Sequence, residues 1–130
     1  MTGASEETVT MHIGEFAEKS GLSLRTIRHY DEVGLLKPSG RSEGGFRLYS
    51  QDDLSRLLLI RRMKPLGYSL DEMTALLRII DTLKNDPPVA DAATVRMELD
   101  RFIGETVSRR EKLRAQVEMA DEFLELLRTR

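Results

Sequence analysis

Three side chains that can bind anions lie within one short segment of the sequence. Arg25, Arg28 and His29 fall on one side of a helix that is predicted to begin after Ser23 and to stop at Gly34. Guanidinium groups suit phosphate oxygens and guanine edges, and an imidazole can donate a hydrogen bond to a phosphate. This spacing therefore predicts a surface that contacts the backbone or the base edges of a nucleic acid.

The charge of the chain is unevenly distributed. The formal net charge is −2, but the segment from Arg25 to Lys64 carries nine basic and five acidic side chains, a local charge of +4. The rest of the chain therefore carries −6. A basic segment within an acidic protein favours phosphate binding on one face, while the acidic parts repel DNA and so orient the molecule.

Composition excludes several kinds of site. The 130 residues contain no cysteine, so disulfides, thiolate-held metals and iron–sulfur clusters are excluded. His12 and His29 are the two histidines and lie on different predicted elements, so we expect no metal site and no cofactor. No paired carboxylates and no nucleophile with a neighbouring base stand out, which argues against an enzyme.

The chain carries no signal for a membrane or for secretion. No apolar run is long enough to span a bilayer, and no basic start is followed by the apolar core of a signal peptide. We therefore expect a cytoplasmic protein, associated with the nucleoid. The length and the 40% apolar content support one domain with a core and one appended element.

A helix-turn-helix is predicted around Gly21. Apolar periodicity predicts a first helix from Ile13 that stops at Gly21, and Ser23 is a typical N-cap for the second helix. Ala17 lets the two helices approach, Gly21 supplies a left-handed turn, and Ile27 packs the second helix inward. Taken alone, this spacing also fits an ordinary helical hairpin.

A short β-ribbon, or wing, is predicted over 38–50. Turn residues and three glycines precede an alternation that runs from Phe46 to Tyr49. An exposed hairpin of this kind can lie along a phosphate backbone, although a plain surface loop is the alternative.

Two capped helices are predicted after the wing. Ser50 with Asp53 has the spacing of a capping box, and so has Ser69 with Glu72. The first of these helices breaks near Pro65, and Pro65 also predicts an extended backbone for the residue before it. Together, the helix-turn-helix, the wing and these two helices make up a predicted DNA-binding domain, which we place at 10–82. A flexible leader at 1–9 precedes it, and a linker at 83–91 follows it.

A long helix with heptad spacing is predicted over 92–128. Such a helix is too long to be covered by the small domain, so we expect it to form a coiled coil with a second copy, with a fold back onto its own domain as the alternative. The predicted dimerisation residues are Leu99, Ile103, Leu113, Val117, Ala120, Leu124 and Leu127. The predicted fold class is therefore mainly α, a winged helix-turn-helix domain followed by a coiled-coil helix.

The order and spacing of three segments resemble the MerR family of bacterial transcriptional regulators. These segments are "MHIGEFAEKSGLSLRTIRHYDEVGLLKP", "EGGFRLYSQDDL" and "RRMKPLGYSLDEM", and the resemblance runs from Met11 to about Ile80. It implies a winged-helix DNA-binding domain and a long helix that pairs antiparallel with its twin. No separate effector-binding domain is expected, because the predicted coiled coil ends close to the last residue.

The resemblance also implies which residues contact DNA. It assigns the second helix to the major groove and the wing to the backbone, and for Tyr30 a buried ring with only its hydroxyl at the DNA is the alternative. Pattern and resemblance together predict DNA contacts by Arg25, Thr26, Arg28, His29, Tyr30, Lys37, Arg41, Arg47, Tyr49 and Lys64.

The implied function is regulation of transcription. By resemblance, a homodimer binds an inverted repeat inside a promoter and distorts the spacer DNA so that RNA polymerase can engage. Two alternatives stay open, an architectural or excisionase-like DNA-binding factor and a coiled-coil adaptor that binds protein. We expect no small-molecule cofactor, and the sequence identifies no effector.

Overall fold

The computed structural model describes residues 10–130, and the leader expected at 1–9 lies outside the described residues. The chain divides after Thr74 into two compact units. As predicted, the fold is mainly α with a small sheet and a long last helix. The helical elements are, in chain order, α2 (Ile13–Ser20), α3 (Leu24–Glu32), α4 (Gln51–Met63), the 3-10 turn η1 (Lys64–Leu66), α5 (Leu70–Lys84) and α6 (Val89–Arg128).

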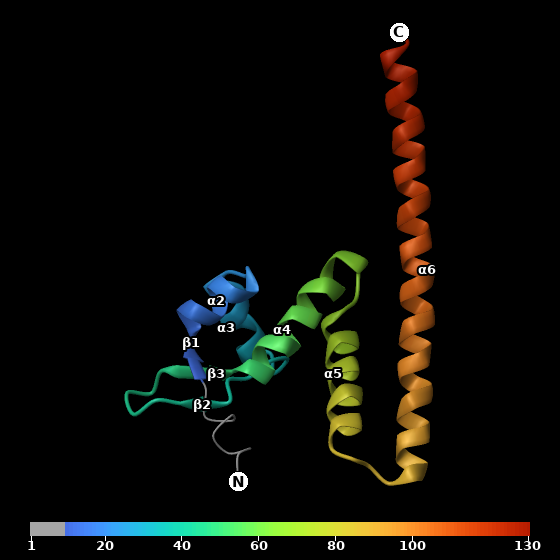
Figure 1. Cartoon of the computed structure of the whole chain (residues 1–130). Helices are drawn as coiled ribbons and strands as arrows, with labels where there is room; N and C mark the ends of the chain where they lie inside the picture. The colour runs from blue at the N-terminus through green and yellow to red at the C-terminus, as the bar shows by residue number, and fades with distance from the viewer. Residues whose placement is uncertain (1–9) are drawn as a thin grey trace. The chain divides into compact units, whose positions relative to one another are not determined.

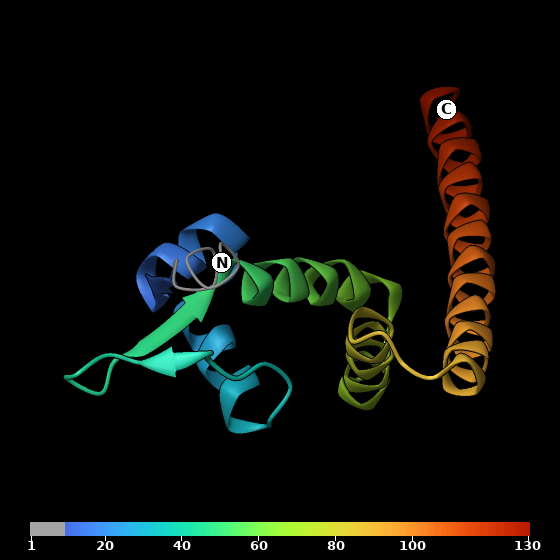
Figure 2. The same ribbon diagram turned by 60° about the horizontal axis from the view of Figure 1, so that its bottom comes forward.

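The predicted wing is present as an antiparallel hairpin. Its strands are β2 (Gly40–Arg41) and β3 (Arg47–Ser50), and Figure 2 shows them side by side, joined by a turn. A third strand, β1 (Thr10–His12), pairs with the other edge of β3, so β3 is central. We did not predict β1, because three residues are too few to show a strand periodicity and their pairing comes from β3.

The helix-turn-helix of α2 and α3 has the geometry that its sequence predicts. Gly21 adopts the left-handed conformation (φ 73°), and its N–H donates to the Ala17 carbonyl at 2.9 Å. Ser23 caps α3 by accepting a hydrogen bond from the Thr26 N–H at 3.1 Å. The helix ends before Gly34, which is also left-handed (φ 79°), as predicted.

An aromatic stack lies at the centre of the first unit. The rings of Phe16 and Tyr49 are nearly parallel (7°) with their centroids 4.0 Å apart, and both side chains are fully buried. Ile27 from α3 and Leu57 and Ile60 from α4 are also fully buried. These side chains hold α2, α3 and α4 against the sheet, and α2 contacts α3, α4 and β3 directly.

Both predicted capping boxes are present. The Ser50 side chain accepts from the Asp53 N–H, and the Asp53 carboxylate accepts from the Ser50 N–H at 2.9 Å. The Ser39 hydroxyl also donates to the Asp53 carboxylate, which ties the base of the wing to the start of α4. Ser69 and Glu72 form the same reciprocal pair, at 3.1 and 2.8 Å.

The long helix α6 is unbroken over 40 residues (Figure 1). It begins at Val89, three residues before the predicted start and directly after Pro88, whose backbone is extended (φ −52°, ψ 150°). Within the described chain, α6 has no fully buried side chain, and many large apolar ones are exposed. The exposed ones include Ile103, Val107, Leu113, Val117, Phe123, Leu124 and Leu127.

No helix among residues 10–130 combines the length and the apolar character that crossing a bilayer requires.

The buried hydroxyl of Tyr49 generates a stability prediction. Among the described residues, the Tyr49 oxygen is buried and has no hydrogen-bond partner. An unpartnered buried hydroxyl loses its hydration without compensation, so Tyr49→Phe should raise the free energy of unfolding by about 1 kcal/mol. Urea denaturation measures this change as a higher midpoint with an unchanged slope. A lower midpoint would mean that the hydroxyl makes a stabilising hydrogen bond.

Candidate nucleic-acid interface

A groove of about 560 Å³ runs beside α3 and gathers six of the ten predicted contact residues. Its lining is Arg25, Thr26, Arg28, His29, Tyr30, Glu32 and Lys64. Five of these positions belong to consecutive turns of α3 between residues 25 and 30, and Lys64 comes from η1, far along the sequence. The fold thus adds a cation from a second element to the basic side of α3.

The amphipathic pattern of α3 positions these side chains. Ile27, Tyr30 and Asp31 are buried, so Arg25, Arg28 and the neighbouring imidazole are turned outward and exposed. The Ser23 hydroxyl donates to the Thr26 hydroxyl oxygen at 2.9 Å. The Thr26 hydroxyl can therefore still donate its own proton to a ligand.

Tyr30 is a buried residue whose side chain reaches the edge of the groove. The residue is almost fully buried and also belongs to the groove lining. Burial raises the pKa of its hydroxyl above the ordinary value, so the phenol stays protonated and can act as a donor. The structure favours the alternative in which the ring is buried.

Tyr49 does not join this surface. Its side chain is fully buried against Phe16, because on β3 it alternates to the core side, opposite Met11 of β1. Burial is the main cause that raises the pKa of the Tyr49 hydroxyl. The predicted backbone contact by Tyr49 would require this buried ring to become accessible.

Lys64 corrects our expectation about the backbone before Pro65. Lys64 is helical (φ −59°, ψ −50°), not extended, and its N–H donates to the Ile60 carbonyl. The helical hydrogen bonding of α4 and the following 3-10 turn outweigh the preference of a residue before proline, and proline itself fits the first turn of η1. As a result, the exposed Lys64 lines the groove.

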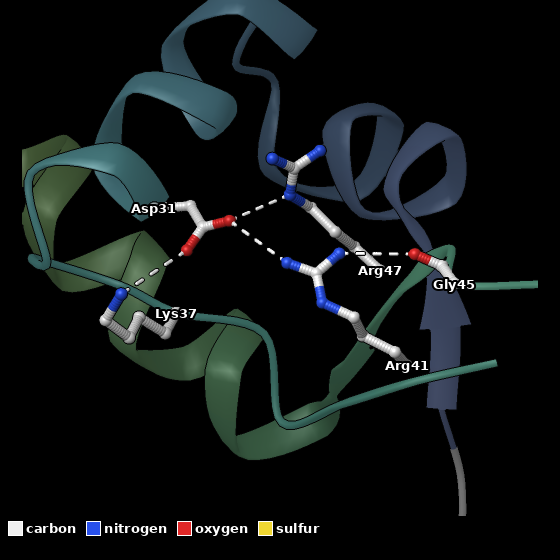
Figure 3. Close-up of polar contacts among 5 residues, drawn as sticks. All are labelled: Asp31, Lys37, Arg41, Gly45 and Arg47. Atoms are coloured by element: carbon white, nitrogen blue, oxygen red, sulfur yellow. Dashed lines mark hydrogen bonds and ion pairs between the residues drawn. The ribbon is translucent and has the colours of Figure 1, made fainter.

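The three remaining predicted contacts converge on one carboxylate (Figure 3). Asp31 accepts a hydrogen bond from Arg47 Nε at 2.8 Å, and Lys37 Nζ and Arg41 Nη2 each lie 3.8 Å from its oxygens. The hydrogen bond that Arg47 donates to Asp31 is the main cause that raises the pKa of Arg47. We call these four residues the Asp31 cluster.

Our sequence reasoning missed two acidic residues of this surface. Asp31 lies one helical turn after Ile27, so an acid on the inward side of α3 was a visible signal of a buried ion pair. Glu32 lines the groove beside the cations, and nothing in its spacing distinguishes it from an ordinary surface acid.

Known proteins with similar sequences and folds are regulators. The family model described as "MerR HTH family regulatory protein" matches residues 11–79. An uncharacterised HTH-type transcriptional regulator of Pseudomonas aeruginosa, PA4778, is 43% identical over 111 residues, which are 83% of each chain. The transcriptional activator TipA of Streptomyces coelicolor is 38% identical over 110 residues, 85% of this chain and 40% of TipA.

A solved structure extends the similarity to the fold. HiNmlR, a MerR family regulator lacking the sensor domain and crystallised with promoter DNA, is 28% identical with a TM-score of 0.63. The match covers 92% of this chain and 85% of HiNmlR. With a family model over more than half of its length and a relative 43% identical over 83% of it, the chain belongs to the MerR family of helix-turn-helix transcriptional regulators.

Proposed function

We propose that this protein regulates transcription as a homodimer that binds an inverted repeat inside a promoter. The observation that carries the proposal is the groove beside α3, where three cationic side chains, Arg25, Arg28 and Lys64, share one surface with polar donors. This surface is suited to DNA because guanidinium groups can bind phosphates or read guanine edges. The site of action is then the nucleoid, in the cytoplasm.

Each residue of the groove has a proposed role. Arg25 and Arg28 bind guanine edges or phosphates, and Lys64 binds a phosphate as a point charge. Thr26 and His29 donate to the backbone, and the Tyr30 hydroxyl does so from the edge of the core.

The proposed dimer rests on the exposed apolar side chains of α6. At about 1.5 Å per residue, a 40-residue helix is about 60 Å long, and its large apolar residues need a partner surface. A second copy supplies a matching heptad. The domain organisation we propose is a DNA-binding domain at 10–82, a linker at 83–91, of which 85–88 lie between α5 and α6, and a dimerisation helix at 92–128. The proposed dimer contacts are Leu99, Ile103, Leu113, Val117, Ala120, Leu124 and Leu127.

We also propose that the dimer distorts the spacer between the promoter elements and so lets RNA polymerase engage. Bending a site costs several kcal/mol, and extra backbone contacts must offset that free energy. The wing can contribute such contacts through Lys37 and Arg41, which are exposed. The similarity to a regulator crystallised with promoter DNA supports action at a promoter.

The first prediction of this proposal concerns the groove. The wild-type protein should enrich particular fragments from sheared DNA of its source genome; the most enriched one is called the selected fragment. For Arg25→Ala with Arg28→Ala, affinity for this fragment should fall by at least tenfold, and the slope of log K against log salt should fall by about 0.9 for each of the two arginines that binds a phosphate. Fluorescence anisotropy over a salt series measures both quantities.

The matched control is Arg96→Ala with Arg101→Ala. It removes the same charge from exposed positions on α6, outside the groove, and should leave affinity and slope nearly unchanged. Equal losses of affinity in the two double variants would mean that DNA binding depends on the net charge of the protein and not on the groove. A wild-type protein that enriches no fragment would favour the adaptor alternative, and one that binds long arrays would favour the architectural alternative.

The second prediction concerns the dimer. Leu113→Ala with Leu124→Ala removes two exposed leucines from the proposed contact and should weaken the dimer by roughly 4 kcal/mol or more. Sedimentation equilibrium over a concentration series measures the change in dissociation constant. The control is Met119→Ala with Leu126→Ala, which are also exposed apolar residues of α6 but lie off the heptad positions. An unchanged sedimentation mass of the first variant at low concentration would reject the proposed contact.

A further inference from the structure

The Asp31 cluster pairs three cations with one nearly buried carboxylate (Figure 3). The Asp31 side chain is only 11% exposed, and within 4 Å of its oxygens lie nitrogens from Lys37, Arg41 and Arg47. These residues come from the end of α3, the loop after it and both strands of the wing. One carboxylate thus joins the wing to the helix that lines the groove.

The three cations are held unequally. Arg47 is 28% exposed and donates a hydrogen bond to Asp31 at 2.8 Å, the length of a charge-assisted bond. Lys37 and Arg41 are 69% and 52% exposed and lie at 3.8 Å, beyond hydrogen-bond length. Exposed ion pairs at this distance contribute little stability, so another anion can replace the carboxylate.

Charge balance separates the cluster into two parts. Asp31 and Arg47 together form a neutral pair that is largely shielded from water. Lys37 and Arg41 are the remaining two positive charges, and Arg41 is also aimed along the wing by donating to the Gly45 carbonyl at 3.2 Å. The cluster therefore offers two exchangeable cations beside a fixed pair.

We propose that Asp31 is an internal counter-ion that sets specificity: it holds Lys37 and Arg41 in the free protein and yields both to DNA phosphates, while Arg47 stays bound to it. This inference rests on the proposed function and refines it. It assigns Arg47 to positioning the wing and only Lys37 and Arg41 to phosphate contact.

The same exchange discriminates between DNA sequences. On DNA of random sequence, weakly placed phosphates compete with a carboxylate that already partly neutralises the two cations, so binding is weak. On the correct site, the contacts in the groove hold the backbone in register with the wing, and the exchange is favourable. Asp31 thus lowers non-specific affinity more than specific affinity.

The first test counts phosphate contacts. Lys37→Ala and Arg41→Ala should each lower the slope of log K against log salt by about 0.9, whereas Arg47→Ala should leave the slope unchanged. The probes are the selected fragment and a random-sequence duplex of the same length. A slope lowered equally by Arg47→Ala would overturn the division of roles, and unchanged slopes for Lys37→Ala and Arg41→Ala would overturn the exchange.

The second test removes the counter-ion. Asp31→Asn should raise affinity for the random-sequence duplex by about threefold to tenfold and lower the ratio of selected to random affinity by about tenfold. The control Glu18→Gln removes one exposed negative charge from α2 and should change neither quantity appreciably. Equal effects of the two variants, or an unchanged ratio for Asp31→Asn, would overturn the proposal.

Two features separate this test from that of the proposed function. If the wild-type protein shows no preference for the selected fragment, the proposed function fails; if it shows that preference and Asp31→Asn leaves the ratio unchanged, only the counter-ion proposal fails. A purely structural Asp31 would change the folded fraction, and thus both affinities in proportion, with no change in slope. If Asp31→Asn does not fold, the salt slopes of Lys37→Ala, Arg41→Ala and Arg47→Ala on the selected fragment test the proposal without it.

Discussion

The hydrogen bond from Arg47 Nε to Asp31 Oδ2 is the link on which the DNA-facing surface depends. Its donor and acceptor atoms are 2.8 Å apart, its acceptor is the nearly buried Asp31 carboxylate, and it joins β3 to the end of α3. Two residues further along β3, Tyr49 enters the core, and Ser50 caps α4. A single strand of four residues thus orients the wing, completes the core and starts the next helix, so its position determines where all three of these lie.

Local chemistry made much of this fold predictable. The left-handed turn at Gly21 and the caps at Ser23, Ser50 and Ser69 each depend on residues within a few positions of one another, and the structure contains them all. The groove was partly predictable for the same reason, because an outward-facing row on an amphipathic helix follows from its buried face. Lys64 joined it only through packing between distant elements.

The remaining features depend on contacts between distant segments. The strand at 10–12 forms because β3 offers an open edge, and Tyr49 is buried because Phe16 stacks on it. The Asp31 cluster brings together residues up to 16 positions apart, so the spacing in α3 could indicate a buried acid but not its partners. The backbone of Lys64 follows the helix before it against the local preference set by Pro65. For β1, Tyr49 and the Asp31 cluster a tertiary contact supplies what local sequence does not encode, whereas for Lys64 the helical hydrogen bond to Ile60 outweighs the preference set by Pro65.

The central claim is that one dimer binds two half-sites through α3 and the wing. Hydroxyl-radical footprinting of the wild-type protein on the selected fragment tests it most directly. The account predicts two protected half-sites related by an inverted repeat between the promoter elements, with altered cleavage of the spacer between them. Continuous protection along an array, or no protection at concentrations that saturate binding, would contradict it.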